Sequence, residues 1–191
     1  STQTTAYTTH SSTPPSPVVT TPAASAVVGG EFQVNTYTTQ SQDRASITAL
    51  NDGGFVVTWQ SNGQDDPSTS GFSDFDFMFD SYFGIYGQRY DSSGAKVGNE
   101  FQVNTETSGS QELPSITALN DGGFVAAWES PDGSNGGIYG QRYDSSSAKI
   151  GGEFRFNTHT NAHQANPSVT ALDDGGFVAT WQSHNQDGSS Q

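Results

Sequence analysis

The sequence predicts an all-β protein built from four-stranded antiparallel repeats and preceded by an extended N-terminal arm. One hairpin pattern occurs three times, at 46–61, 115–130 and 168–183. In each copy a β-type run, a turn of Asn or Asp with Gly, and a second β-type run follow one another, which is a strong local hairpin signal. Two further strand-like segments lie between the hairpins in a fixed order. A unit that returns at regular spacing indicates a repeat architecture.

Residues 1–28 differ in composition from the rest of the chain. Seventeen of them are Ser, Thr or Pro, and such a stretch buries too little apolar surface to fold alone. Three interpretations remain open: a disordered linker, a stalk with O-linked glycans, or an arm that becomes ordered on a neighbour. The candidate glycan acceptors are Thr4, Thr5, Thr8, Thr9, Ser11, Ser12, Thr13, Thr20 and Thr21. The candidate anchors of the arm in an apolar groove are Val18, Val19, Val27 and Val28.

The repeat domain spans 29–191 and opens with a predicted strand at 31–36. This segment, Glu-Phe-Gln-Val-Asn-Thr, alternates polar and apolar side chains, as a half-buried strand does. Closely similar segments return at 100–105 and 153–158 and are predicted to be the fourth strand of each cycle.

Each repeated hairpin supplies the first two strands of a cycle. In the first copy, residues 46–50 lead into Asn-Asp-Gly-Gly, whose glycines supply the positive-φ positions that a tight turn needs. The second strand carries apolar side chains on both faces, which favours an interior position. A third strand, Gly-Ile-Tyr-Gly-Gln-Arg-Tyr-Asp, is predicted at 84–91 and again at 137–144. Its arginines, Arg89 and Arg142, are expected to pair with nearby carboxylates.

The motifs share one spacing along the chain. Asp52 and Asp121 are 69 residues apart, whereas Asp121 and Asp174 are 53 apart, because the first cycle holds a 16-residue insertion. The chain contains the leading strand, complete cycles at 46–105 and 115–158, and a partial cycle at 168–183, or about two and a half cycles. Two complete cycles cannot close a propeller, which needs about four blades or more. We therefore expect an open or sandwich-like array.

The insertion lies between Ser61 and Gly84 and is rich in aromatic and acidic residues. Phe75, Phe77 and Phe79 alternate with acidic side chains, so a strand here would present an aromatic face. This face could pack over the core of its own domain, or it could contact a neighbouring subunit or a ligand. Exposed aromatic patches mark interaction sites, which makes the three phenylalanines candidate assembly residues.

Acidic residues in the loops after the second strand are candidate calcium ligands. Asp65, Asp66, Asp132 and Asp187 offer carboxylate oxygens on turns that contain glycine, and such ligands suit Ca²⁺. The alternative is ordinary polar turns, since no loop has the complete spacing of an EF-hand. The sequence shows no group of residues typical of catalysis, and we expect that the chain is not an enzyme.

The composition narrows the choice of partners. Twenty acidic against six basic residues give a formal charge of −14, which argues against nucleic acid as a partner. The chain has no cysteine, so disulfides and thiolate chemistry are excluded. It also has no apolar run near the roughly 20 residues of a membrane span. Few Lys and Arg among abundant Ser, Thr, Gly and Asn are typical of bacterial extracellular proteins.

Three motifs carry a resemblance to a known family. Phe-Gln-Val-Asn-Thr, Ala-Leu-Asn-Asp-Gly-Gly-Phe-Val and Gly-Ile-Tyr-Gly-Gln-Arg-Tyr-Asp recur in a fixed order over residues 29–191. In this the chain resembles the tandem repeats, roughly 50 residues long, of large secreted bacterial surface proteins and adhesins, which often also carry hemolysin-type calcium-binding repeats. The resemblance implies an extracellular or cell-surface location and a propeller-blade-like repeat, and it implies no particular activity.

An incomplete cycle at each end of the chain leads to a functional hypothesis. The last hairpin lacks its third and fourth strands, while the leading strand lacks the third strand that should precede it. We expect head-to-tail assembly into a filament, in which the arm of one subunit adds a strand to the next. The alternatives are a carbohydrate-binding adhesin module, in which the inserted aromatics stack on sugars, and a fragment of a giant repeat adhesin.

Overall fold

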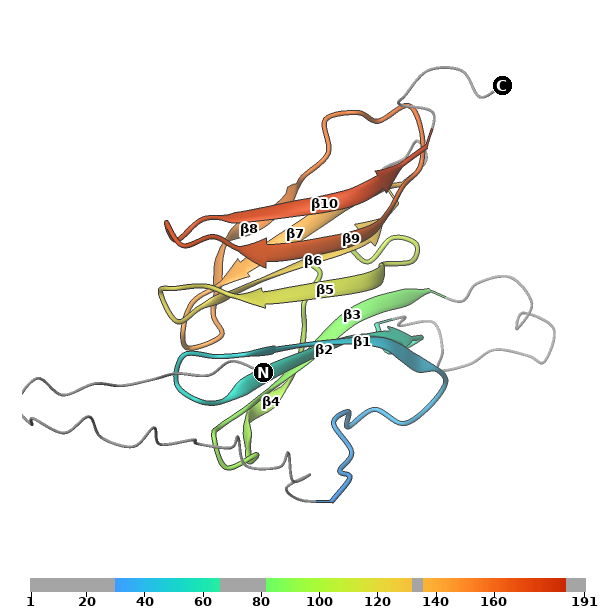
Figure 1. Cartoon of the computed structure of the whole chain (residues 1–191). Helices are drawn as coiled ribbons and strands as arrows, with labels where there is room; N and C mark the ends of the chain where they lie inside the picture. Colours follow the sequence, from blue (N-terminus) through green and yellow to red (C-terminus); the bar gives the residue numbers. More distant parts are fainter. Residues whose placement is uncertain (1–29, 66–81, 132–135, 185–191) are drawn as a thin grey trace, which may run out of the picture. The chain divides into compact units, whose positions relative to one another are not determined.

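The computed structural model describes residues 30–65, 82–131 and 136–184. The chain divides into two units, 1–32 and 33–191, and every strand described below belongs to the second. Over the described residues the regular elements are ten antiparallel strands (Figure 1), which confirms the all-β prediction. They are β1 (Gln42–Ala49), β2 (Phe55–Asn62), β3 (Phe83–Tyr90), β4 (Lys96–Gln102), β5 (Glu112–Ala118), β6 (Phe124–Ser130), β7 (Gly137–Tyr143), β8 (Lys149–Arg155), β9 (Gln164–Ala171) and β10 (Phe177–Ser183).

The strands form three sheets that follow the repeats of the sequence. Two sheets have four strands each, in the orders β1-β2-β3-β4 and β5-β6-β7-β8, and β9 pairs with β10 in a third. Each strand pairs with the next along the chain, and the register repeats as well. Val57 lies opposite Gln88 in the first sheet, and the equivalent Ala126 lies opposite Gln141 in the second. The four-strand cycle read from the sequence is therefore present twice in full and once in half.

The hairpin turns form for the local reasons that the sequence indicates. The first glycine of each turn has a positive φ, namely 85° at Gly53, 86° at Gly122 and 87° at Gly175, a conformation that glycine adopts without a Cβ penalty. The turn aspartate accepts a hydrogen bond from the N–H two residues later, in the pairs Asp52–Gly54 (2.9 Å), Asp121–Gly123 (3.0 Å) and Asp174–Gly176 (2.9 Å). Turn chemistry thus sets all three hairpins.

The predicted strand at 31–36 is not formed, and the fourth strands lie earlier than predicted. Residues 30–36 are irregular, because a strand needs a hydrogen-bonded neighbour and the third strand that should flank this segment is not present in the described chain. The fourth strands were expected at 100–105 and 153–158. Instead β4 and β8 begin directly after the turn that follows the third strand and end at Gln102 and Arg155.

The sheets pack face to face in chain order. β5 lies against β1 and β2, and β9 lies against β5 and β6 (Figure 1). The core therefore consists of layers between successive repeats. The layer between the first two sheets contains Leu50, Val56, Ile85, Val103, Ile116, Phe124, Ala126, Trp128 and Tyr143. The layer between the second sheet and the β9–β10 hairpin contains Leu119, Val125, Ala127 and Val169, with Phe154, Phe156 and Phe177 partly buried beside them.

The interior position predicted for the second strand holds in the complete repeats only. Every residue of β2 and β6 is buried or half-buried, whereas β10 alternates between half-buried and exposed residues. In the described part of the chain no helix is long and apolar enough to cross a membrane.

Candidate functional site

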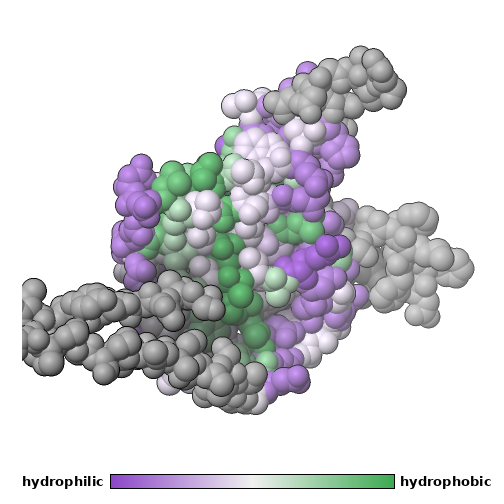
Figure 2. Space-filling model, viewed as in Figure 1, coloured by the Kyte–Doolittle hydropathy of each residue, from purple (hydrophilic) through white to green (hydrophobic). Residues whose placement is uncertain are grey.

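The free edge of β10 is the first of two incomplete ends in the array. β2 pairs with β3 and β6 with β7, but β10 pairs with β9 alone among the described strands. Val178 is also 43% exposed, while the equivalent Val56 and Val125, which the following repeat covers, are both 0% exposed. Figure 2 shows hydrophobic residues gathered at this end and continuing as a band across the viewed face. Unpaired strand edges with apolar side chains favour association with another chain.

One glycine shows that the last hairpin keeps a sequence suited to a third strand. A Cβ on Gly54 would collide with the carbonyl oxygen of Tyr90 in β3, and a Cβ on Gly123 would collide with that of Tyr143 in β7. Glycine is therefore required where the third strand passes. Gly176 occupies the equivalent position in the third copy, and a Cβ there would meet only its own turn.

The second incomplete end is the segment 33–37, which is equivalent to residues 102–106 at the end of β4 and just beyond it. Its contacts with the first repeat are those that residues 103–105 make with the second. Tyr90 Oη donates to Val34 O at 3.2 Å, as Tyr143 Oη donates to Val103 O at 3.1 Å. Thr36 N donates to Glu100 Oε2 at 2.6 Å, as Thr105 N donates to Glu153 Oε2 at 2.8 Å. The segment thus keeps these contacts, although no described strand lies beside it.

An asparagine in this segment is equivalent to the asparagines that bind the third strand in the complete repeats. In the complete repeats, Asn104 Oδ1 accepts a hydrogen bond from Ile85 N, and Asn157 Oδ1 accepts one from Ile138 N, both at 2.8 Å. These bonds tie the third strand to the end of the fourth. Asn35 is the equivalent residue, and its amide nitrogen is bonded as in the second copy. Among the described residues no third-strand N–H reaches its oxygen.

Side-chain amides bridge successive repeats at the hairpin turns. Asn51 Nδ2 donates to the carbonyl oxygens of Leu119 and Asn120, at 3.2 and 3.3 Å. Asn120 Nδ2 donates in turn to those of Leu172 and Asp173, at 3.2 and 3.1 Å. We call these bonds the amide ladder. In the third copy the equivalent position is Asp173, whose carboxylate has no proton to donate.

Hydroxyl groups form a second set of repeat-to-repeat bonds. Ser46 Oγ accepts from Ile116 N at 3.3 Å, and the equivalent Ser115 Oγ accepts from Val169 N at 3.1 Å. Sequence reasoning missed both sets, because each bond joins residues more than 50 positions apart. The available signal was that these polar residues recur at the same place in each copy.

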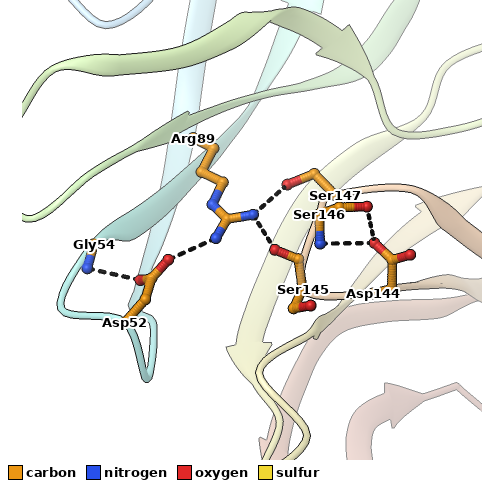
Figure 3. Close-up of polar contacts among 7 residues, drawn as sticks. All are labelled: Asp52, Gly54, Arg89, Asp144, Ser145, Ser146 and Ser147. Carbon is orange, nitrogen blue, oxygen red and sulfur yellow. Dashed lines mark hydrogen bonds and ion pairs between the residues drawn. The ribbon is translucent and has the colours of Figure 1, made fainter.

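Arg89 in β3 joins the first repeat to the second, as Figure 3 shows. Its guanidinium donates to Asp52 Oδ2 at 2.6 Å, to the carbonyl oxygen of Ser145 and to Ser147 Oγ at 3.4 Å. Arg142 pairs with Asp121 at the same distance of 2.6 Å, so the predicted arginine–carboxylate pairs are confirmed.

The two arginines differ in what lies beyond the ion pair. The turn contacted by Arg89 belongs to the following repeat, and its equivalent after the third copy lies outside the described chain. The side chain of Arg89 is accordingly 12% exposed, and that of Arg142 is 37% exposed. Arg142 therefore presents an unfilled contact toward the open end of the array.

Hydrogen bonds lower the pKa of the turn aspartates. The pKa of Asp52 and of Asp121 lies below the ordinary value of 3.8, first because the N–H of Gly54 or Gly123 donates to the carboxylate, and then because an arginine does. Each bond favours the ionised form.

These shifts predict that the fold loses stability in acid. The pKa of Asp91 and of Asp144 is also lowered, mainly by serine hydroxyls. A lowered pKa stabilises the folded state above the ordinary carboxyl value, and this contribution disappears as the pH falls through about 4 to 3. The pKa of Glu106 is lowered too, by the hydroxyl and the N–H of Ser108. Glu112 acts in the opposite sense, since burial raises its pKa, but it is one carboxyl group against five. We expect the urea midpoint to fall between pH 6 and pH 3. It should fall less in the double variant Asp52→Asn/Asp121→Asn, and an equal fall in both proteins would contradict the assignment.

Most sequence-predicted site residues lie outside the described residues. These are the glycan acceptors of the arm, the anchors Val18, Val19, Val27 and Val28, the aromatics Phe75, Phe77 and Phe79, and the calcium candidates Asp66, Asp132 and Asp187. Asp65 is described, and its Oδ2 accepts a hydrogen bond from Gln102 Nε2 at 3.0 Å. Within the described ranges no three acidic, histidine or cysteine side chains are close enough to hold a metal ion.

His163 contributes to the contact between the second repeat and the third. Its Nε2 lies 2.6 Å from Glu129 Oε1 in β6, and its ring contacts that of His184. The pair links the second repeat to the start of the third.

The chain matches no protein-family model, and no curated protein sequence matches it. A functional assignment therefore depends on the three internal copies, which show what each repeat contacts when its neighbour is present.

Proposed function

We propose that the chain is a structural subunit of an extracellular filament, assembled head to tail by strand addition through its N-terminal arm. The observation that carries the proposal is the free edge of β10. Its sequence matches that of β2 and β6, including the apolar residue at Val178 and the glycine at Gly176, yet no described strand covers it. A third strand from another copy would pair with this edge as β3 pairs with β2 and β7 with β6.

The segment 33–37 supports the N-terminal arm as the strand that fills that edge. It is equivalent to residues at the end of a fourth strand, and in the complete repeats one strand, the third, lies between the fourth strand and the second. Residues upstream of the segment are therefore in the right chain order to act as the third strand. The last hairpin of one subunit and the first 36 residues of the next would then complete one four-stranded, propeller-blade-like unit.

The arm has the composition that this role requires. Backbone hydrogen bonds supply most of the affinity when a strand is added to a sheet edge, and alternate side chains set the register. Val18, Val19, Val27 and Val28 are the apolar residues that such a strand would bury. The two ends of the chain differ, so the contact is heterologous, and a heterologous contact that does not close on itself makes a helical filament. The low content of Lys and Arg supports the extracellular location.

Removing residues 1–28 is expected to abolish assembly, because the free edge of β10 would then lose its added strand. Negative-stain microscopy and light scattering should show filaments for the full chain and monomers for the truncated one. A full-length variant with the four valines replaced by serine controls for the length of the arm and should also remain monomeric. Filaments from the truncated chain, or monomers from the full chain at every concentration tested, would rule out the proposal.

A further inference from the structure

We infer that the exposed face of the β9–β10 hairpin docks on the first repeat of a second copy, in the register that joins the repeats within one chain. The inference rests on the proposed head-to-tail function and names the residues that meet. It uses described residues alone, so it can be tested separately from the arm.

We call the contact between two successive repeats of one chain an internal join. The exposed face of the third repeat is equivalent to the faces that the internal joins bury in the first two. Leu50 and Val56 are buried against the second repeat, and Leu119 and Val125 are buried against the third. Their equivalents in the third repeat are exposed, with Leu172 in the turn that precedes β10 and Val178 on β10 itself. Thr180, two residues after Val178, is exposed as well. This exposed surface is the end face.

The complementary surface lies on β1 at the start of the array. Ile116 and Val169 are the residues that insert into the end face of the preceding repeat, and they are 6% and 7% exposed. Ile47 is their equivalent in the first repeat and is 64% exposed. The two exposed surfaces are thus the two halves of one repeat-to-repeat join. The hydrophobic band in Figure 2 crosses the viewed face from the β9–β10 hairpin toward the sheet that contains β1. A second copy is the occupant that carries both halves.

The hydrogen bonds of the internal joins fix the register of this contact. Ile116 N donates to Ser46 Oγ, and Val169 N donates to Ser115 Oγ. Ser168 is equivalent to Ser46 and Ser115, and Ile47 is equivalent to Ile116 and Val169. The same register therefore has Ile47 N of the second copy donate to Ser168 Oγ of the first. A disulfide forms only between residues whose Cα atoms lie within about 7 Å of each other, so a cross-link between positions 47 and 168 would report this register.

One position makes the join between copies different from the joins within a chain. At the internal joins the amides of Asn51 and Asn120 donate to two carbonyl oxygens each. At the join between copies, Asp173 would face the carbonyl oxygens of Leu50 and Asn51 and could donate to neither. The amide ladder stops there. The join between copies is therefore weaker than the internal joins, so subunits can separate while each repeat array stays folded.

Cysteine cross-linking tests this register, because the chain has no cysteine of its own. The double variant Ile47→Cys/Ser168→Cys should form a ladder of disulfide-linked oligomers on non-reducing gels at concentrations where the wild type assembles. Ser46→Cys/Ile116→Cys is the internal control and should form an intrachain disulfide that changes mobility without a ladder. Val97→Cys/Ser168→Cys pairs the same end with an exposed residue of β4 and should give no ladder.

The outcomes separate this inference from the proposed function. A ladder from the 47/168 pair and none from the 97/168 pair supports the docking register. Filaments of the wild type without a ladder from the 47/168 pair would leave the proposed function standing and overturn the inference. A ladder from a chain that never forms filaments would support the docking contact and remove the filament. If neither a ladder nor filaments form, the docking contact and the proposed function are both overturned. This result is expected if the arm of the same chain covers the end face.

Discussion

Replacing Trp128 by alanine is expected to lower the free energy of unfolding by about 3–5 kcal/mol, the range for a large buried aromatic residue. Trp128 is fully buried in the layer between the first two repeats, where it belongs to the same cluster as Leu50, Val56 and Ile85. Its removal would leave a cavity between two sheets that both pack on it. Urea unfolding followed by circular dichroism measures the loss, and a fold of this size is stable by about 5–15 kcal/mol in total.

The matched control is the equivalent residue of the last hairpin. Trp181 is half-buried, with its Nε1 donating to Gln164 Oε1 at 3.0 Å, because among the described residues no third strand lies beside it on β10. In the monomer, Trp181→Ala should cost less than half as much as Trp128→Ala. Under assembling conditions the two costs should converge, since the added strand would bury Trp181. Equal losses in the monomer would show that the last hairpin is already covered.

The repeat architecture could be predicted because its signals are local. The turns depend on glycines with positive φ and on aspartates that bond two residues ahead, and both are set by four consecutive residues. The four-strand cycle followed from the order of the motifs, and hairpin connections place consecutive strands side by side. Arg89 was assigned to a carboxylate for a similar reason, because it recurs with Arg142 at one place in the cycle.

The contacts between repeats could not be predicted, because they join residues distant in the chain. The sequence shows that the third copy has Asp173 where the first two copies have Asn51 and Asn120. The effect of this difference is clear only when the asparagine side chains are seen to bond to the next repeat. The segment at 31–36 failed as a strand for a related reason. Its alternation was correct for a strand, but formation of a strand depends on a partner and not on pattern alone.

Replacing Asp173 by asparagine is expected to tighten assembly by about 5- to 150-fold. The new amide could donate to the carbonyl oxygens of Leu50 and Asn51 of the next copy, as Asn51 and Asn120 do within the chain. Two hydrogen bonds at about 0.5–1.5 kcal/mol each correspond to this range of affinity, since about 1.4 kcal/mol is a factor of ten. The critical concentration for filament formation, measured by light scattering, should fall accordingly.

Two further variants separate the hydrogen bonds from the charge. Asp173→Ala removes the carboxylate without adding a donor, so it should recover only the part of the gain that comes from lost repulsion. Asn120→Asp introduces an aspartate at an internal join, in the position that Asp173 has in the third copy. Its carboxylate would face the carbonyl oxygens of Leu172 and Asp173. It should lower the free energy of unfolding by about 1–3 kcal/mol, because those groups lose their donor and a charge takes its place. If Asp173→Asn and Asp173→Ala assemble equally well, the amide contributes nothing at the join. If Asn120→Asp is as stable as the wild type, the amide ladder does not hold the repeats together, and the weak join between copies needs another cause.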